Sequence, residues 1–157
     1  MASGKTAVGR RLAARLRLPF IDLDREIEKR AKKSVRVLFR DIGESGFRKL
    51  ETALLKKTSL GGPRVIALGG GAILSSFNRS LLRRHGRVIY LSAPLSVLRR
   101  RGGKEKSRRP LWDASLAERF YQRLPLYRKT AHITVRASLG GPGDIARRIV
   151  TRLHETR

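Results

Sequence analysis

The segment Ser3-Gly4-Lys5-Thr6 stands near the start of the chain and is followed directly by an amphipathic stretch. Glycine, lysine and a hydroxyl residue at the opening of a helix are typical of a phosphate-binding loop, where backbone N–H groups and the lysine hold a nucleotide. In this interpretation Lys5 contacts the β- and γ-phosphates, and Thr6 offers its hydroxyl to Mg²⁺. Three such residues also arise by chance, so their position at the opening of a helix carries the interpretation. The first glycine of the full pattern G-x-x-x-x-G-K-[ST] would precede Met1.

Asp22 and Asp24 follow a short apolar run and are separated by one residue. In an extended chain, alternation points both carboxylates to the same face. One carboxylate would hold hydrated Mg²⁺, and the other would orient or deprotonate a substrate hydroxyl. Alternatively, Asp24 only caps the helix that follows, which is a common role for aspartate.

Arg48 and Glu51 are three residues apart in a predicted helix, so their side chains share one face. They form either a surface ion pair worth about 0.2–0.5 kcal/mol, or an arginine oriented by Glu51 to hold a substrate carboxylate. The spacing leaves both alternatives open.

Three consecutive glycines, Gly69-Gly70-Gly71, follow a buried apolar run. They form either a flexible strand-to-helix turn or a place where a ligand approaches the backbone closely. The entropic cost of three glycines favours the ligand.

The stretch 99–109 contains seven basic residues, one glutamate and two glycines. Most charge runs of this kind are solvated loops. Opposite a phosphate site, however, a basic loop can close as a lid that excludes water and neutralises charge in the transition state.

The composition of the 157-residue chain indicates one domain with a single core. The chain has no cysteine and three separated histidines, which excludes disulfides, thiolate metal sites and a cysteine nucleophile. No apolar run is long enough for a membrane span, and no secretory signal is visible, so a cytoplasmic protein is expected. Thirty-seven Lys/Arg against twelve Asp/Glu give a net charge of +25, which attracts anions generally. Because the basic residues are spread along the chain, they indicate at most non-specific, charge-driven binding to nucleic acid.

The apolar pattern alternates between short β-rich runs and helical stretches, which predicts an α/β fold with a mainly parallel sheet. Four strands are expected, at about 18–22, 64–68, 87–91 and 132–135. In such a sheet, ligands bind beyond the carboxyl ends of the strands. Both the Asp-x-Asp pair and the triple glycine stand at such ends, so the sequence predicts one site there.

In this order, the motifs resemble those of the shikimate kinase family. The matching stretches are S-G-K-T, F-I-D-L-D-R-E-I-E, L-F-R-D-I-G-E-S-G-F-R-K-L-E, A-L-G-G-G-A-I, R-R-P-L-W and R-L-P-L-Y. The resemblance implies a three-layer P-loop kinase fold over residues 1–157, with a basic lid at about 99–113. It also implies a monomer that phosphorylates the 3-hydroxyl of shikimate with ATP and Mg²⁺, in aromatic amino-acid synthesis.

On the nucleotide side, the resemblance implies contacts from five consecutive residues: Ser3, Gly4, Lys5, Thr6 and Ala7. Thr6 would bind the metal, and Asp22 would sit in the outer shell of the metal. Lys5 and Arg109, the latter in the R-P-L motif of the lid, would act on the transferred phosphoryl group. Arg100 or Arg101 would stack on adenine.

On the substrate side, the resemblance implies that Asp24 binds the hydroxyls and serves as the base. Arg48 and Arg123 would clamp the shikimate carboxylate, with Gly70 near a ring hydroxyl and Glu51 steadying Arg48. Two aromatic side chains, Phe39 and Phe47, would pack against the ring of shikimate.

The same resemblance implies a β-strand ahead of the phosphate loop, in the middle of the sheet. Without it, we expect a domain that is incomplete at its N-terminus, with impaired stability and activity. A short β-rich run ending in Gly-x-Met, placed upstream, is expected to rescue both. The rival functions are another small-molecule kinase, such as a gluconate kinase, and a non-catalytic nucleic-acid-binding relative.

Overall fold

The computed structural model describes residues 3–102 and 116–155. Within these ranges it contains four short strands: β1 (Phe20–Asp22), β2 (Val65–Ala67), β3 (Ile89–Ser92) and β4 (Ile133–Arg136). The helices are α1 (Lys5–Leu16), α2 (Leu23–Ala31), α3 (Val35–Ser59), the 3₁₀ turn η1 (Ala72–Leu74), α4 (Ser76–His85), α5 (Leu95–Gly102), α6 (Leu116–Thr130) and α7 (Pro142–Glu155). The strands lie close to their predicted positions, and the α/β class predicted from the apolar pattern is confirmed.

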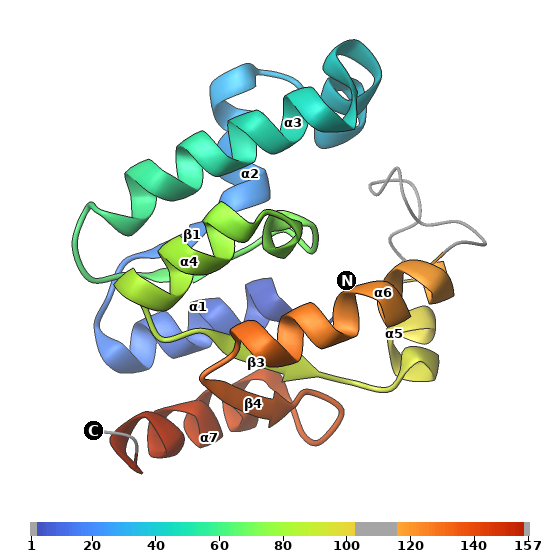
Figure 1. The fold of residues 1–157 in the computed structure, drawn as a ribbon. Coiled ribbons are helices and arrows are strands. Elements are labelled where there is room, and N and C mark those ends of the chain that lie inside the picture. The colour runs from blue at the N-terminus through green and yellow to red at the C-terminus, as the bar shows by residue number, and fades with distance from the viewer. Residues whose placement is uncertain (1–2, 103–115, 156–157) are drawn as a thin grey trace.

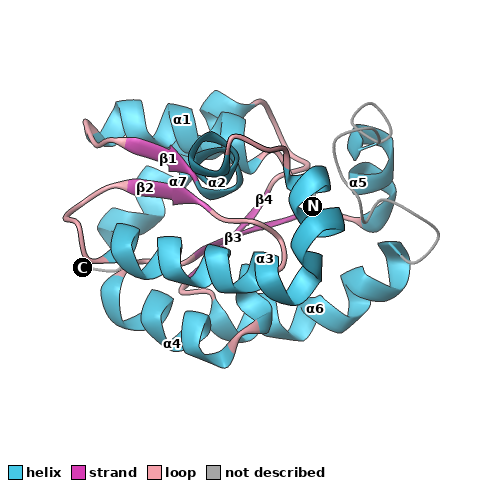
Figure 2. Ribbon diagram, turned by 90° about the horizontal axis from the view of Figure 1, so that it is seen from above, coloured by secondary structure: helices cyan, strands magenta, loops and turns pink. Residues whose placement is uncertain are grey.

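The four described strands form two separate parallel pairs (Figure 2). Phe20 of β1 lies opposite Val65 of β2, and Ile89 of β3 lies opposite Ile133 of β4. Helices α2 and α3 connect the first pair, and α5 and α6 stand between the strands of the second. A parallel pair needs such a crossover, because a tight turn can join only antiparallel strands.

Helices cover both faces of the strands, so that α3 and α4 lie on one side and α7 on the other (Figure 1). One buried apolar cluster belongs to α1, β4 and α7: Val8, Leu12, Ile133, Val135, Ala137, Ile145, Ala146 and Ile149. The other belongs to α2, α3 and α4: Leu23, Ile27, Leu38, Phe47, Leu54, Leu55 and Leu81. Along β2, Val65 packs against the first cluster and Ile66 against the second, as the two-residue period of a strand requires.

A cavity of about 840 Å³ lies between the two strand pairs and is lined by both β2 and β3. Its apolar lining comes from these strands and from helices on both faces, including Leu12, Leu16, Val65, Leu82, Ile89 and Ile149. Ser3 and Lys5 line the same cavity, together with Gly69 and Gly70, which follow β2. The phosphate loop therefore opens where the carboxyl ends of the strands meet.

Helix α3 changes direction at Gly43, which has φ 68° and ψ 177°. The non-helical backbone of Gly43 therefore divides α3 into two helical segments. It places Phe39 and Phe47, on either side of the break, with their ring centroids 4.7 Å apart.

No helix in the described ranges is long and apolar enough to cross a membrane. Of the predicted lid at 99–113, only the part that ends α5 belongs to the described residues.

Candidate active site

The phosphate loop ends at Gly4, the residue that precedes α1. Gly4 has φ 83°, a left-handed conformation that costs other residues about 1–2 kcal/mol. No side chain caps this helix end. The first N–H groups of α1 and the positive end of the helix dipole are therefore suited to an anion such as a phosphate.

Thr6 and Asp22 form the contact between α1 and the end of β1. The Thr6 hydroxyl donates to Asp22 Oδ2 at 2.6 Å, and the Asp22 side chain is almost fully buried. Asp22 Oδ1 also accepts from the backbone N–H of Arg25 at 3.4 Å, which makes Asp22 the N-cap of α2. A hydroxyl and a carboxylate side by side are the kind of oxygen ligands that Mg²⁺ takes alongside waters and nucleotide phosphates.

The prediction that Asp22 and Asp24 share one face of an extended strand is wrong. Asp22 ends β1, whereas Asp24 already lies in the first turn of α2. The capping role considered for Asp24 belongs to Asp22. As a result, the two carboxylates serve different neighbours: Asp22 contacts Thr6, and Asp24 reaches the segment that begins at Gly69.

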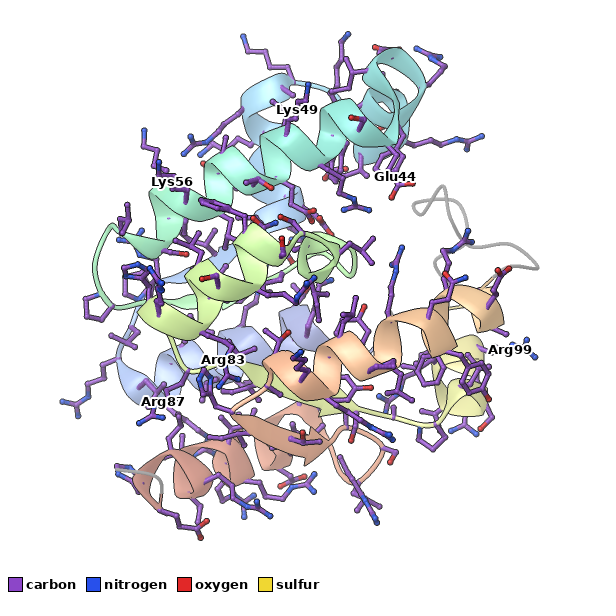
Figure 3. All side chains as sticks on the ribbon, in the orientation of Figure 1. Glu44, Lys49, Lys56, Arg83, Arg87 and Arg99 are labelled. Carbon is purple, nitrogen blue, oxygen red and sulfur yellow. The ribbon has the colours of Figure 1, made fainter. Side chains whose placement is uncertain are left out.

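Two carboxylates of its own helix hold the guanidinium of Arg48. Nη1 lies 2.7 Å from Glu51 Oε2, and Nη2 lies 3.1 Å from Glu44 Oε1. The Glu51 side chain is 0% exposed and that of Arg48 only 23%. The alternative of a solvated surface pair is therefore wrong, and Arg48 is pre-oriented. Figure 3 shows Glu44 on the side of α3 that faces the rest of the molecule, whereas Lys49 points outward.

The rings of Phe39 and Phe47 lie against the same guanidinium. The Arg48 Cζ atom is 5.7 Å from the Phe39 centroid and 5.4 Å from the Phe47 centroid. Contacts within about 6 Å of a ring face attract a cation. The two rings therefore hold the Arg48 guanidinium in addition to its two ion pairs.

Burial raises the pKa of the Glu51 carboxyl, while the neighbouring Arg48 lowers it and Asp24 raises it. One oxygen, Oε1, is buried without a hydrogen-bond partner among the described residues. A buried charge of this kind is stable only while its partner is present, since removing one member of a buried pair costs about 3–5 kcal/mol. Glu51 and Arg48 therefore stabilise each other's orientation.

The triple glycine packs against these acidic and basic groups. A Cβ on Gly69 would lie 2.5 Å from Glu51 Oε1 and 2.7 Å from Asp24 Oδ1, and one on Gly71 would collide with the Arg48 guanidinium. Neither glycine has a positive φ. A side chain at Gly69 or Gly71 would therefore displace the charged ends of Glu51, Asp24 or Arg48, so the reason for glycine at these two positions is steric.

Arg123 and Tyr127 of α6 contact the same segment through the carbonyl of Gly70. The Tyr127 hydroxyl donates to the Gly70 carbonyl at 2.6 Å, and Arg123 Nη1 donates to it at 3.4 Å. Arg123 is buried, with 5% of its surface exposed. The two arginines predicted to form a clamp, Arg48 and Arg123, thus both meet the glycine segment.

Three further arginines were predicted at the nucleotide: Arg100, Arg101 and Arg109. Arg109 lies outside the described residues. Arg101 Nη1 donates to the Ala137 carbonyl at 3.0 Å, whereas Arg100 is exposed. The choice between these two for stacking on adenine stays a prediction.

Residues 3–102 and 116–155 contain no group of three or more His, Cys, Asp or Glu side chains placed to hold a metal. Mg²⁺ sites in phosphoryl-transfer proteins usually take one or two protein oxygens and complete their shell with water and phosphate oxygens, so the Thr6–Asp22 pair is compatible with such a site.

Sequence reasoning missed two residues of the cluster, Glu44 and Tyr127. Glu44 precedes Arg48 by four residues, and Tyr127 follows Arg123 by four, so each shares a helix face with its arginine. This spacing of four residues could have predicted that Glu44 and Tyr127 lie beside the two arginines. The partner of the Tyr127 ring, Tyr90 of β3, is far away in sequence and left no signal.

Known proteins provide an independent comparison. The family model described as shikimate kinase matches residues 1–154. A shikimate kinase from Nitrosomonas europaea is 43% identical over 99% of this chain and 76% of its own length. One from Nitrosospira multiformis is 44% identical over 98% of this chain and 80% of its own length.

Solved structures agree with these relatives. The shikimate kinase of Acinetobacter baumannii, in complex with shikimate, superposes with a TM-score of 0.95 at 35% identity, over 100% of this chain and 90% of that one. The enzyme from Aquifex aeolicus gives a TM-score of 0.88 at 33% identity, over 99% and 93% of the two chains. The match of the family model across the chain, the identities above 40% and the shared fold lead to one conclusion: the chain belongs to the shikimate kinase family.

Proposed function

We propose that this protein transfers the γ-phosphoryl group of ATP to the 3-hydroxyl of shikimate. One observation carries the proposal: Arg48, fixed by a fully buried Glu51, lies against the same glycine segment as Asp24 and Arg123. Two arginines and a carboxylate around one side-chain-free segment match a small substrate that has one carboxylate and several hydroxyls.

On the substrate side, Arg48 and Arg123 bind the carboxylate of shikimate. Asp24 accepts the proton of the attacking hydroxyl, and Gly70 lies at a ring hydroxyl. Phe39 and Phe47 cover one side of the ring. A carboxylate held at hydrogen-bond distance from a hydroxyl is the geometry that general-base catalysis needs.

On the nucleotide side, the backbone from Ser3 to Ala7 holds the phosphates, and Lys5 neutralises charge on the group that is transferred. Thr6 and Asp22 would hold Mg²⁺, which would neutralise the negative charge that develops on the phosphates during transfer. Arg109 belongs to the same proposal through its R-P-L motif.

The test is a coupled measurement of ADP release with shikimate, and with gluconate as the matched control substrate. We expect turnover that requires shikimate and Mg²⁺ and a product phosphorylated at the 3-hydroxyl, identified by NMR. Turnover with gluconate and none with shikimate would contradict the proposal.

We also propose that the cavity between β2 and β3 is the place of a fifth strand, supplied by an apolar segment ahead of Ser3. Within the described residues, β2 pairs only with β1 and β3 pairs only with β4, so each of the two flanking strands has one edge without a neighbouring strand. Ser3 lines the cavity beside the residues that follow β2. A strand parallel to its neighbours would therefore lead directly into the phosphate loop. A monomeric state and a cytoplasmic location stay predictions from the sequence.

A further inference from the structure

One backbone carbonyl in the site, that of Gly70, accepts from two side chains of the same helix. Tyr127 Oη lies 2.6 Å from it and Arg123 Nη1 lies 3.4 Å from it. The two donors are four residues apart on α6 and so share one face. A carbonyl oxygen has two lone pairs, so it accepts both donors at once.

The two hydrogen bonds are unequal. A 2.6 Å O–H···O contact is short, whereas 3.4 Å lies beyond the usual range for N–H···O bonds. Tyr127 is thus the main partner of the Gly70 carbonyl, and Arg123 is a weakly held second donor. The guanidinium has five N–H donors in a planar fork, so it can leave this contact for a better acceptor.

The Tyr127 hydroxyl is itself held in place by its ring. That ring stacks on Tyr90 of β3, with centroids 5.2 Å apart and planes 13° from parallel. Burial raises the pKa of the Tyr127 hydroxyl, while the charge of Arg123 and a hydrogen bond with it lower the pKa. The hydroxyl is therefore a protonated donor at neutral pH, fixed by contact with a strand.

We infer that Tyr127 is a positioning residue that keeps Arg123 available for the substrate carboxylate. The Tyr127 hydroxyl satisfies the Gly70 carbonyl and leaves the guanidinium fork free to turn to a carboxylate. Without that hydroxyl, Arg123 is the side-chain donor that remains to the carbonyl among the described residues, and the carbonyl then competes with the substrate for the guanidinium. This inference rests on the proposed function, in which Arg123 binds the carboxylate of shikimate.

The main test is Tyr127→Phe, which keeps the ring and its stacking and removes only the donor. We expect the KM for shikimate, and its Kd measured by calorimetry, to rise about tenfold, which corresponds to about 1.4 kcal/mol. The kcat and the KM for ATP should change less than about twofold. A merely structural role would instead lower the melting temperature and kcat, with no selective change in the KM for shikimate.

Two matched controls separate the hydroxyl of Tyr127 from tyrosine hydroxyls in general. Tyr90→Phe keeps the stacked pair, and Tyr121→Phe changes a side chain on α6 that is 62% exposed. Both variants should keep the KM of the unaltered protein.

A substrate analogue in which the carboxylate is reduced to a primary alcohol gives the sharper control. Arg123 has no carboxylate to bind in this analogue, so Tyr127→Phe and the unaltered protein should bind it with equal Kd. An equal loss of affinity for shikimate and the analogue would overturn the inference, as would an unchanged Kd for shikimate. If the unaltered protein neither binds nor phosphorylates shikimate, the proposed function itself fails, and that outcome is visible before any variant is compared.

Discussion

The two halves of the site differ in how firmly their side chains are held. In the substrate half, Arg48 is paired with two carboxylates and packed on two rings, and the glycine segment lies close to the charged ends of Asp24, Arg48 and Glu51. In the nucleotide half, one side-chain hydrogen bond, from Thr6 to Asp22, joins the first turn of α1 to β1. This half also borders the cavity between β2 and β3.

In the proposed function, substrate recognition is therefore built from long-range packing of α2, α3 and α6, whereas nucleotide binding depends on a helix end and its backbone. Side-chain substitutions in the substrate half should therefore change the binding of shikimate without changing the binding of ATP. In the nucleotide half, the binding of ATP should depend chiefly on changes to the residues that pack against α1.

The largest expected effect is that of Asp24→Asn. Loss of a general base reduces kcat by about 10²–10⁴-fold, while the amide retains the size of the side chain. Steady-state kinetics with shikimate and ATP measure this effect. Glu26→Gln, on the same helix in an exposed ion pair with Arg30, is the control and should keep full activity. An undiminished kcat in the Asp24→Asn variant would show that Asp24 is not the general base.

The next effect concerns the cavity. Adding a β-rich run whose last three residues are Gly-x-Met, with Met1 as this methionine and Ala2 following it, should raise the free energy of unfolding by several kcal/mol, since each buried backbone group that gains a partner contributes about 1–3 kcal/mol. It should lower the KM for ATP more than the KM for shikimate. Denaturant titration and kinetics measure both. The control is a run of equal length rich in Gly and Ser, which should leave both unchanged. Equal gains from the two runs would contradict a strand in the cavity.

Arg48→Lys should raise the KM for shikimate by about 10–100-fold, because lysine lacks the planar fork that binds a carboxylate and Glu51 at the same time. The KM for ATP should not change, because Arg48 belongs to the substrate half of the site and not to the nucleotide half. Arg40→Lys alters an exposed arginine of the same helix and should have no effect. A parallel rise in both KM values would show that the two halves are coupled.

Alanine at glycines compares the halves directly. Gly69→Ala places a methyl group 2.5 Å from Glu51 Oε1 and should cost about 1–3 kcal/mol of stability, with weaker binding of shikimate. Gly4→Ala meets no atom within 4 Å but has a positive φ, so it should cost about 1–2 kcal/mol through strain and weaken ATP binding instead. Gly143→Ala meets no atom within 4 Å and has no positive φ, and should be neutral or slightly stabilising. Identical kinetic profiles for the first two variants would contradict the division of the site.

The smallest effect lies outside both halves. His132 Nδ1 accepts from the Val88 backbone N–H at 3.0 Å, and burial together with Arg83 and Arg87 lowers the pKa of His132. The neutral imidazole is therefore the bound form, so its contribution is present above the ordinary pKa of about 6.5 and is lost as the pH falls through the lowered value. Denaturant titration between pH 7.5 and 5 should show a loss of no more than about 1 kcal/mol. His132→Gln should reduce this pH dependence, whereas His85→Gln, at an exposed position, should not. Neither KM should change.

Part of this architecture was predictable because its causes are local. Strand and helix positions follow from apolar periodicity, and the break at Gly43 follows from the residue type. The motif order predicted the cluster of Asp24, Arg48 and Arg123. The shared face of Asp22 and Asp24 was predicted wrongly, because the strand ends at Asp22 and the helix begins one residue later.

The sequence alone therefore determined the family, the order of elements and most residues of the site, since these depend on residue type and spacing along the chain. Only the tertiary structure decided what those residues do to one another. It buried Glu51, which turned an i, i+3 pair into a fixed arginine. It enclosed Gly69 and Gly71, which turned a flexible sequence into a steric requirement. It also brought Tyr90 and Tyr127 together from distant positions. Burial and long-range contacts depend on how α3, α6 and β3 pack against one another. The spacing of residues within a single element does not predict this packing.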